Sequence, residues 1–133
     1  MTDFRFRKTM LRVKDLDKSI KFYTGILGMV LLRQRDYEAA KFTNAFVGYG
    51  DEATHPVLEL THNWERSENY VLGEGFGFLG IDVPDVYAVC DRLEKQGVNI
   101  TRRPGPMRGS DSVIAFIEDP DGYRIELVQM KDT

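Results

Sequence analysis

The chain has few of the residues that most often build metal and redox sites, with one cysteine and two histidines among 133 residues. The single thiol, Cys90, excludes an intrachain disulfide and a cysteine-cluster metal site. A net charge of −3 gives no reason to expect nucleic acid or an anionic membrane as a partner. The chain also lacks an apolar run of transmembrane length and an N-terminal signal core. A cytoplasmic protein is therefore expected.

What the sequence does contain is an internal repeat with an offset of 70 residues, in which residues 10–16 align with residues 80–86. Each copy begins with a short apolar strand, followed by an aspartate that is placed to cap a helix and later by a glycine that ends it. These residues are Asp15 with Gly28, and Asp85 with Gly97. With 42% hydrophobic residues, the length predicts one domain, residues 1–133, with a substantial core.

Alternating apolar residues and turn signals predict the same element order, βαβββ, in both copies. The first copy has a helix over about 17–27, and the second has a helix between Asp85 and Gly97. The predicted strands are 6–13, 30–34, 41–49, 56–63, 77–83, 98–103, 112–118 and 123–129. These elements indicate an α+β fold in which module one covers about 6–63, a linker about 64–76, and module two about 77–130.

The repeat also singles out four equivalent positions. Lys8 and Phe78 stand at the starts of the first strands, and Glu59 and Glu126 stand in the last strands of the two copies. Two modules related by a pseudo-twofold axis would gather these four side chains around one site. Neither histidine joins them readily. His62 is an odd number of residues from Glu59, so it should face the other way, and His55 lies roughly 13 Å along the strand.

Four stretches, TMLRVKDLDKSIKFYTGILGM, AFVGYG, LELTHNW and VIAFIEDPDGYRIEL, resemble the glyoxalase I (lactoylglutathione lyase) family of the vicinal oxygen chelate superfamily. They lie in collinear order and span nearly the whole chain. The resemblance implies paired βαβββ modules that form a curved eight-stranded mixed sheet. It also implies a homodimer in which each site, at the subunit interface, is built from both chains.

Members of that family bind one Ni²⁺ or Zn²⁺ through two histidines and two glutamates. By resemblance these places fall on Lys8, Glu59, Phe78 and Glu126, so both carboxylates match and both histidines are replaced. The family reaction isomerises the hemithioacetal of methylglyoxal and glutathione to lactoylglutathione through an enediolate. Glu126 would be the base, and Glu59 would be a ligand from the partner subunit.

Three further residues match positions that contact glutathione in the family, namely Arg12, Asn63 and Arg108. An arginine suits a carboxylate and an asparagine suits peptide groups. The structural alternatives are a salt bridge for Arg12, a turn cap for Asn63 and a solvated loop for Arg108. The resemblance implies a small-molecule ligand such as a glutathione conjugate.

Replacement of the histidines leaves two interpretations of Lys8. Its ammonium takes over the metal's charge and pairs with Glu59 and Glu126, or it extends to solvent while one carboxyl group is protonated. Two carboxylates alone suit Mg²⁺ or Ca²⁺ weakly and Ni²⁺ or Zn²⁺ poorly, so no metal, or a weakly bound one, is expected.

Two functions remain open. The first is an altered isomerase that uses Glu126 as base and Lys8 as electrophile, and the second is a metal-free binding protein for a small molecule. Impaired or lost Ni²⁺/Zn²⁺ isomerase activity is expected in either case. An extradiol dioxygenase is disfavoured, because its Fe²⁺ site needs the same missing histidines.

Overall fold

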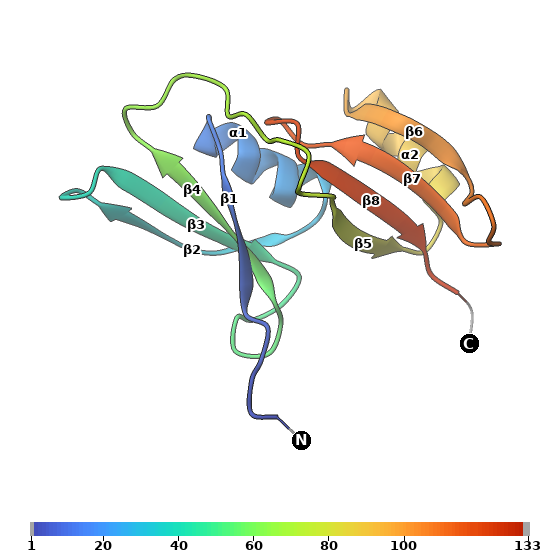
Figure 1. Ribbon diagram of the computed structural model, residues 1–133, viewed down its shortest axis with the longest axis horizontal. Helices are drawn as coiled ribbons and strands as arrows, with labels where there is room; N and C mark the ends of the chain where they lie inside the picture. Colours follow the sequence, from blue (N-terminus) through green and yellow to red (C-terminus); the bar gives the residue numbers. More distant parts are fainter. Residues whose placement is uncertain (1, 132–133) are drawn as a thin grey trace. The chain divides into compact units, whose positions relative to one another are not determined.

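The computed structural model describes residues 2–131, which form two compact units (Figure 1). The first unit extends to Tyr70 and the second begins at Val71. Each unit has its own four-stranded sheet and its own helix. Within the described residues, neither helix is long and apolar enough to cross a membrane.

The first unit has a mixed sheet in the order β1-β4-β3-β2, in which β1 runs parallel to β4 and the other neighbours are antiparallel. Its elements are β1 (Lys8–Arg12), α1 (Leu16–Lys21), the π-helical turn η1 (Phe22–Ile26), β2 (Val30–Tyr37), β3 (Phe42–Gly48) and β4 (Val57–Asn63).

The second unit repeats this plan in the order β5-β8-β7-β6, with β5 parallel to β8. Its elements are β5 (Leu79–Val83), α2 (Val86–Lys95), β6 (Asn99–Pro106), β7 (Val113–Glu118) and β8 (Arg124–Gln129). The predicted α+β class and the order βαβββ, twice, are confirmed. The eight strands form two four-stranded mixed sheets, one in each unit.

The predicted helix boundaries have the expected local chemistry. The side chain of Asp15 accepts a hydrogen bond at 3.1 Å from the amide three residues later, and Asp85 does the same at 3.2 Å. Gly28 and Gly97 follow the helical segments with φ of +79° and +83°, a conformation that glycine adopts without a Cβ clash.

The predicted helix over about 17–27 is present, but its second half is a π-helical turn and not a continuation of the α-helix. The amide of Leu27 donates to the carbonyl of Phe22, five residues back, at 3.0 Å. The Thr24 hydroxyl donates to the carbonyl of Ile20 at 2.6 Å, which competes with the regular helical pattern. This turn places two consecutive aromatic residues in the core.

The two faces of each sheet differ. In the first unit, α1 packs on β3 and β4, over a core that includes Leu11, Val47 and Leu60. Strand alternation directs Glu59, and Phe46 opposite it on β3, to the other face of the sheet. In the second unit, α2 covers one face and Glu126 lies on the other, next in sequence to the fully buried Ile125. Each unit therefore presents one glutamate on the face that its helix leaves uncovered.

Candidate functional site

In the first unit, Lys8 and Glu59 form an ion pair. Lys8 lies opposite Val57 in the parallel register of β1 and β4, and Glu59 follows two residues later on the same face. The distance from Lys8 Nζ to Glu59 Oε1 is 2.7 Å. The Lys8 side chain is 39% exposed and the Glu59 side chain 11% exposed. The ammonium therefore points toward the carboxylate, and the interpretation in which Lys8 extends to solvent is wrong.

The second oxygen of Glu59 is also occupied. Asn44 Nδ2 donates to Glu59 Oε2 at 2.7 Å, and Thr61 Oγ1 donates to Asn44 Oδ1 at 2.9 Å. All three residues are buried, with exposed fractions of 8% for Glu59, 7% for Asn44 and 9% for Thr61. The carboxylate is thus held between an ammonium and an amide whose orientation is fixed by a hydroxyl.

Asn44 was not identified from the sequence, although a signal was present. It is a buried amide in the otherwise largely apolar strand FTNAFVG, and alternation places it on the same face as Phe46. Phe46 lies opposite Glu59 in the register of β3 and β4. A buried amide side chain needs hydrogen-bond partners, so its position two residues from Phe46 indicated a polar contact on the Glu59 face.

Further cations surround the same face. The Lys8 Nζ lies 5.4 Å from the centroid of the Phe46 ring, and the Arg33 Cζ lies 3.7 Å from it. Arg33 also donates two hydrogen bonds to Glu52, at 2.6 and 3.0 Å. The pKa of the Glu52 carboxyl is lowered, first by the hydrogen bond from Arg33 and further by the positive charges of Arg33, Arg7 and Lys8.

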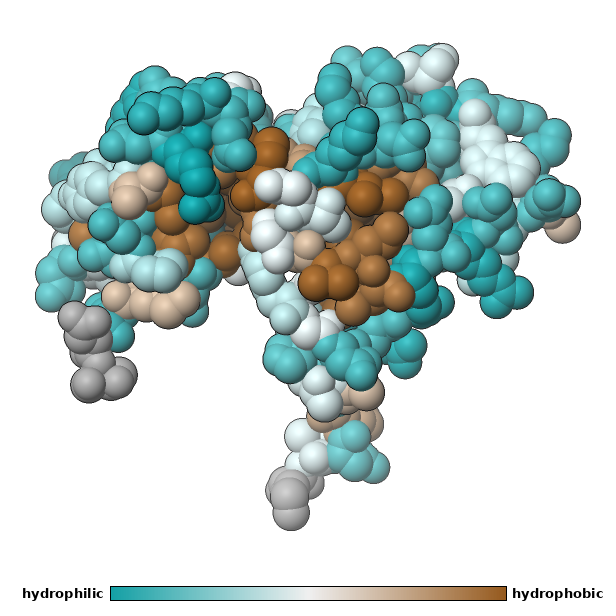
Figure 2. Space-filling view, turned by 180° about the vertical axis from the view of Figure 1, so that it is seen from behind, coloured by the Kyte–Doolittle hydropathy of each residue, from teal (hydrophilic) through white to brown (hydrophobic). Residues whose placement is uncertain are grey.

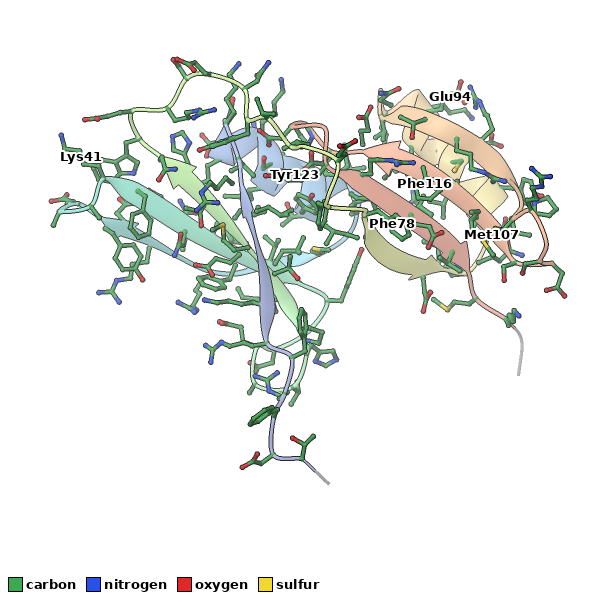
Figure 3. All side chains as sticks on the ribbon, viewed as in Figure 1. Lys41, Phe78, Glu94, Met107, Phe116 and Tyr123 are labelled. Carbon is green, nitrogen blue, oxygen red and sulfur yellow. The ribbon has the colours of Figure 1, made fainter. Side chains whose placement is uncertain are left out.

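In the second unit, the equivalent pair is Phe78 and Glu126. The rings of Phe78 and Phe116 make an edge-to-face contact with centroids 5.2 Å apart (Figure 3). Glu126 lies opposite Phe116 and Gly80 in the two registers and is half-buried. Within the described part of its unit, no hydrogen bond or ion pair engages its carboxylate. Glu126 thus stands beside aromatic rings, and its predicted pairing with Lys8 stays a prediction.

The four side chains do not fit a Ni²⁺ or Zn²⁺ site. Phe78 has no lone pair to donate, and the Lys8 ammonium already neutralises one oxygen of Glu59. Among residues 2–131, no group of three or more histidine, cysteine, aspartate or glutamate side chains is placed to hold a metal ion. The donor set that remains is two carboxylates, one in each unit.

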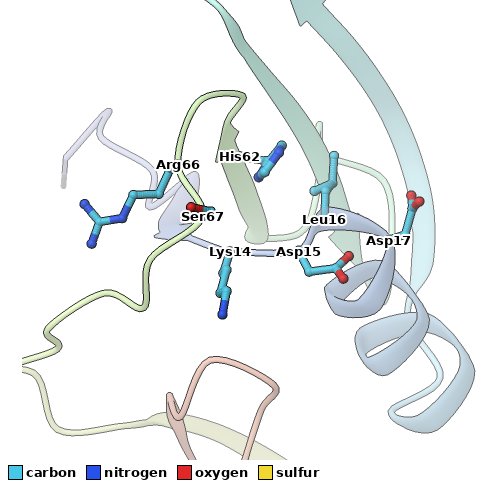
Figure 4. Close-up of a pocket in the computed structure, with 7 residues that line it drawn as sticks. All are labelled: Lys14, Asp15, Leu16, Asp17, His62, Arg66 and Ser67. Carbon is cyan, nitrogen blue, oxygen red and sulfur yellow. The ribbon is translucent and has the colours of Figure 1, made fainter.

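The two histidines lie away from Glu59, as predicted. The register of β3 and β4 runs without a shift, so His62 points to the face opposite Glu59. It lines an open pocket with Lys14 and Arg66 beside the start of α1 (Figure 4). His55 lies in the turn before β4, where its Nδ1 is 2.8 Å from the hydroxyl of Thr54.

Of the three predicted substrate-binding residues, Arg12 and Asn63 lie on neighbouring strands on one face of the first sheet, and Arg108 belongs to the second unit. Arg12 ends β1 on the face of Lys8 and is exposed. Asn63 ends β4 on the Glu59 face, where its Nδ2 donates to the Tyr70 hydroxyl at 3.2 Å. Arg108 lies in the second unit, in an exposed loop between β6 and β7. Their roles in binding stay predictions.

The chain is similar in sequence to known proteins over nearly its whole length. Residues 5–127 match the Glyoxalase/Bleomycin resistance protein/Dioxygenase superfamily. A probable lactoylglutathione lyase of Synechocystis is 55% identical over 121 residues, which cover 91% of this chain and 92% of the relative. A lactoylglutathione lyase of Neisseria meningitidis is 54% identical over 127 residues, which cover 96% of this chain and 91% of the relative.

Solved structures agree with the sequence matches. Glyoxalase I from Zea mays superposes with a TM-score of 0.91 at 47% identity over 97% of this chain, which spans about half (46%) of the maize chain. The trypanothione-dependent glyoxalase I of Leishmania major gives a TM-score of 0.86 at 42% identity over 96% of this chain and 87% of that protein. The chain therefore belongs to the glyoxalase superfamily and, within it, is a glyoxalase I-like protein of the lactoylglutathione lyase family.

Proposed function

We propose that this protein binds a glutathione conjugate, or a closely related small molecule, without Ni²⁺ or Zn²⁺, and that its isomerase activity by the family mechanism is impaired or lost. The observation that carries the proposal is the 2.7 Å ion pair between Lys8 and Glu59. The ammonium supplies positive charge beside Glu59, where a metal ion is expected in the family. A buried carboxylate needs such a partner, and here the partner is covalently part of the chain.

The reaction of the family needs stabilisation of negative charge on an enediolate. A divalent ion, where one is bound, would supply this stabilisation as a Lewis acid. An ammonium provides one positive charge through single hydrogen bonds, and the Lys8 ammonium already donates to Glu59. Slower isomerisation by this chain is the expected consequence.

The ligand class follows from the likeness to proteins that are named lactoylglutathione lyases. We assign Arg12 and Arg108 to ligand carboxylates and Asn63 to a peptide group. All three side chains reach solvent at least in part. Retention of these groups while the metal-binding residues change favours continued binding over continued isomerisation.

A homodimer is part of the proposal. Large apolar side chains are exposed in both units, among them Phe4 (88%), Val30 (58%), Val71 (95%) and Met130 (50%). Figure 2 shows apolar side chains reaching the surface among hydrophilic ones. Apolar surface of this kind is expected where a second copy of the chain packs. Light scattering on the purified protein measures the mass directly and tests this part.

A second candidate function is a metal-independent isomerase. It is favoured by the carboxylate of Glu126, which is half-buried beside Phe116 and carries no hydrogen bond or ion pair within its described unit. A carboxylate without a partner is available to act as a base, and Lys8 would act as the electrophile. Turnover that persists with a chelator present and disappears in Glu126→Gln would identify this function.

The test is metal content after purification with Ni²⁺ and Zn²⁺ present, together with hemithioacetal isomerisation and calorimetric binding of S-methylglutathione. We expect substoichiometric metal, little or no turnover, and measurable binding. The Lys8→His, Phe78→His double variant should gain metal, whereas each single variant should gain little. Stoichiometric metal with family-like turnover in the unaltered protein would overturn the proposal.

A further inference from the structure

The face of the first sheet that carries Glu59 is bordered by cations on both edge strands. On β2, Arg33 lies opposite Phe46 and Arg35 lies opposite Asn44, so both arginines share the face of those residues. On β1, at the other edge, Lys8 reaches Glu59. The central strands β3 and β4 therefore lie between Arg33 and Arg35 on one edge strand and Lys8 on the other.

These cations are held in place by contacts on that face. Arg33 stacks on Phe46 while it donates two hydrogen bonds to Glu52. Arg35 has its guanidinium carbon 4.9 Å from the centroid of the Tyr37 ring, and no carboxylate pairs with it in the described part of the chain. A guanidinium on an aromatic ring keeps its N–H donors available at the ring's edge.

Positive charge on this face exceeds negative charge. The two carboxylates of Glu52 and Glu59 pair with three cations, Arg7, Lys8 and Arg33, and Arg35 adds a fourth cation over the Tyr37 ring. The lowered pKa of Glu52 has its first cause in the hydrogen bond from Arg33 and reflects the same local excess of cations. An anion that approaches this face is attracted.

The floor between the cations is polar as well as aromatic. Asn44 and Thr61 are buried there beside Phe46 and connect through Asn44 to Glu59. Lys8 uses one of the three ammonium protons for Glu59, and its side chain is 39% exposed. The groups facing a ligand on this surface are thus hydrogen-bond donors with net positive charge.

We propose that Lys8, Arg33 and Arg35 form a carboxylate-binding subsite, so that the group the ligand presents to the Glu59 face is anionic. This rests on the proposed function for the identity of the conjugate, in which the acidic group is the substituent on the glutathione sulfur. The subsite itself requires only a small carboxylate. It makes the protein prefer a ligand with an anionic substituent over one with a neutral substituent.

The test compares S-(carboxymethyl)glutathione with its neutral amide analogue, S-(carbamoylmethyl)glutathione, by calorimetry on the full-length protein. We expect the acid to bind about tenfold more tightly at low salt, with a smaller ratio at high salt. Arg35→Gln should reduce that ratio to about twofold. Arg92→Gln removes the same charge from an exposed position on α2 and should leave the ratio unchanged.

Succinate and its monoamide, succinamate, form a second arm that does not depend on glutathione. Succinate should stabilise the unaltered protein more than succinamate does, and Arg35→Gln should diminish this difference. That result supports the subsite even if neither conjugate binds, and in that case only the glutathione proposal fails. Equal affinities of the two conjugates, with equal effects of succinate on the unaltered protein and Arg35→Gln, would overturn the subsite and leave the proposed function standing. Absence of binding in both arms overturns both.

Discussion

Replacement of Lys8 by methionine tests whether the ammonium compensates the buried carboxylate of Glu59. Methionine keeps the length and apolar stem of the side chain and removes the charge. Glu59 then retains only the hydrogen bond from Asn44 and faces a site without a cation at 2.7 Å. An uncompensated carboxylate that is 11% exposed is destabilising, so the variant should unfold more readily than the unaltered protein.

The magnitude lies between two limits. Removal of one partner from a fully buried ion pair costs about 3–5 kcal/mol. Exposed pairs contribute about 0.2–1 kcal/mol. Lys8 is 39% exposed, which admits solvent to the pair, and Asn44 continues to satisfy one carboxylate oxygen. We therefore expect a loss of about 1.5–2 kcal/mol for Lys8→Met, which lowers the unfolding temperature by about 4–8 °C in a chain of this length.

Thermal unfolding at pH 7 and one fixed protein concentration measures the effect. Lys41→Met is the matched control, because Lys41 pairs with Glu65 at 3.0 Å where both side chains are exposed, 61% and 77%. That change should cost less than about 0.5 kcal/mol. The double variant Lys8→Met, Glu59→Gln removes the stranded charge and should be more stable than Lys8→Met alone, since the amide at position 59 needs no cation.

If Lys8→Met unfolds at the same temperature as Lys41→Met, or if Glu59→Gln destabilises the Lys8→Met background further, the compensation argument is wrong. In that case the Lys8–Glu59 contact is a surface ion pair with no energetic role. The proposal that the protein binds no Ni²⁺ or Zn²⁺ would then need different support.

Three further outcomes are expected. Glu52→Gln should lower stability most above pH 4.5, the ordinary pKa of the carboxyl group, because the charged carboxylate that pairs with Arg33 stabilises the folded state there. This difference in stability should vanish as the pH falls through the lowered pKa of Glu52 in the folded state, and a pH-independent difference in acid denaturation would contradict it. Asp119→Ala should cost about 2–3 kcal/mol in urea unfolding, because its buried carboxylate accepts two backbone amides at 2.9 Å each, whereas Asp111→Ala, with a side chain 95% exposed, should cost less than about 0.5 kcal/mol; equal losses would refute this. Burial raises the pKa of the Cys90 thiol, so its reaction with a disulfide reagent at pH 8 should be at least about tenfold slower than in denaturant, and equal rates would contradict the burial.

The fold could be predicted from the sequence because its signals are local and occur twice. Asp15 and Asp85 cap helices in both copies, and alternation gives each strand its two faces. The π-helical turn after Lys21 was missed, since helical periodicity does not reveal that the Thr24 hydroxyl donates to the Ile20 carbonyl or that the Leu27 amide reaches Phe22. The extension of β2 to Tyr37 was also missed, because the stack of Tyr37 on Phe42 is a pairing between strands.

The site was predictable to the extent that it depends on strand parity. The internal repeat singled out Lys8 and Glu59, and strand parity placed His62 on the face opposite Glu59. Strand parity could not reveal that Asn44 would donate to the second oxygen of Glu59. Nor could it reveal that Glu52, between β3 and β4, would pair with Arg33 of β2. Those partners come from segments far apart in sequence, and only the register of the sheet brings them together.

The two positions that the family resemblance assigns to histidine ligands hold residues of opposite character. In the first unit, Lys8 adds a positive charge beside Glu59, so the carboxylate is neutralised where it stands. In the second, Phe78 adds an aromatic ring against Phe116, so the surroundings of Glu126 become more apolar. A histidine at position 8 alone would leave position 78 without a lone-pair donor. A histidine at position 78 alone would leave the Lys8 ammonium, which has no lone pair, at position 8. Neither single change restores a set of donors, so recovery of metal binding requires both.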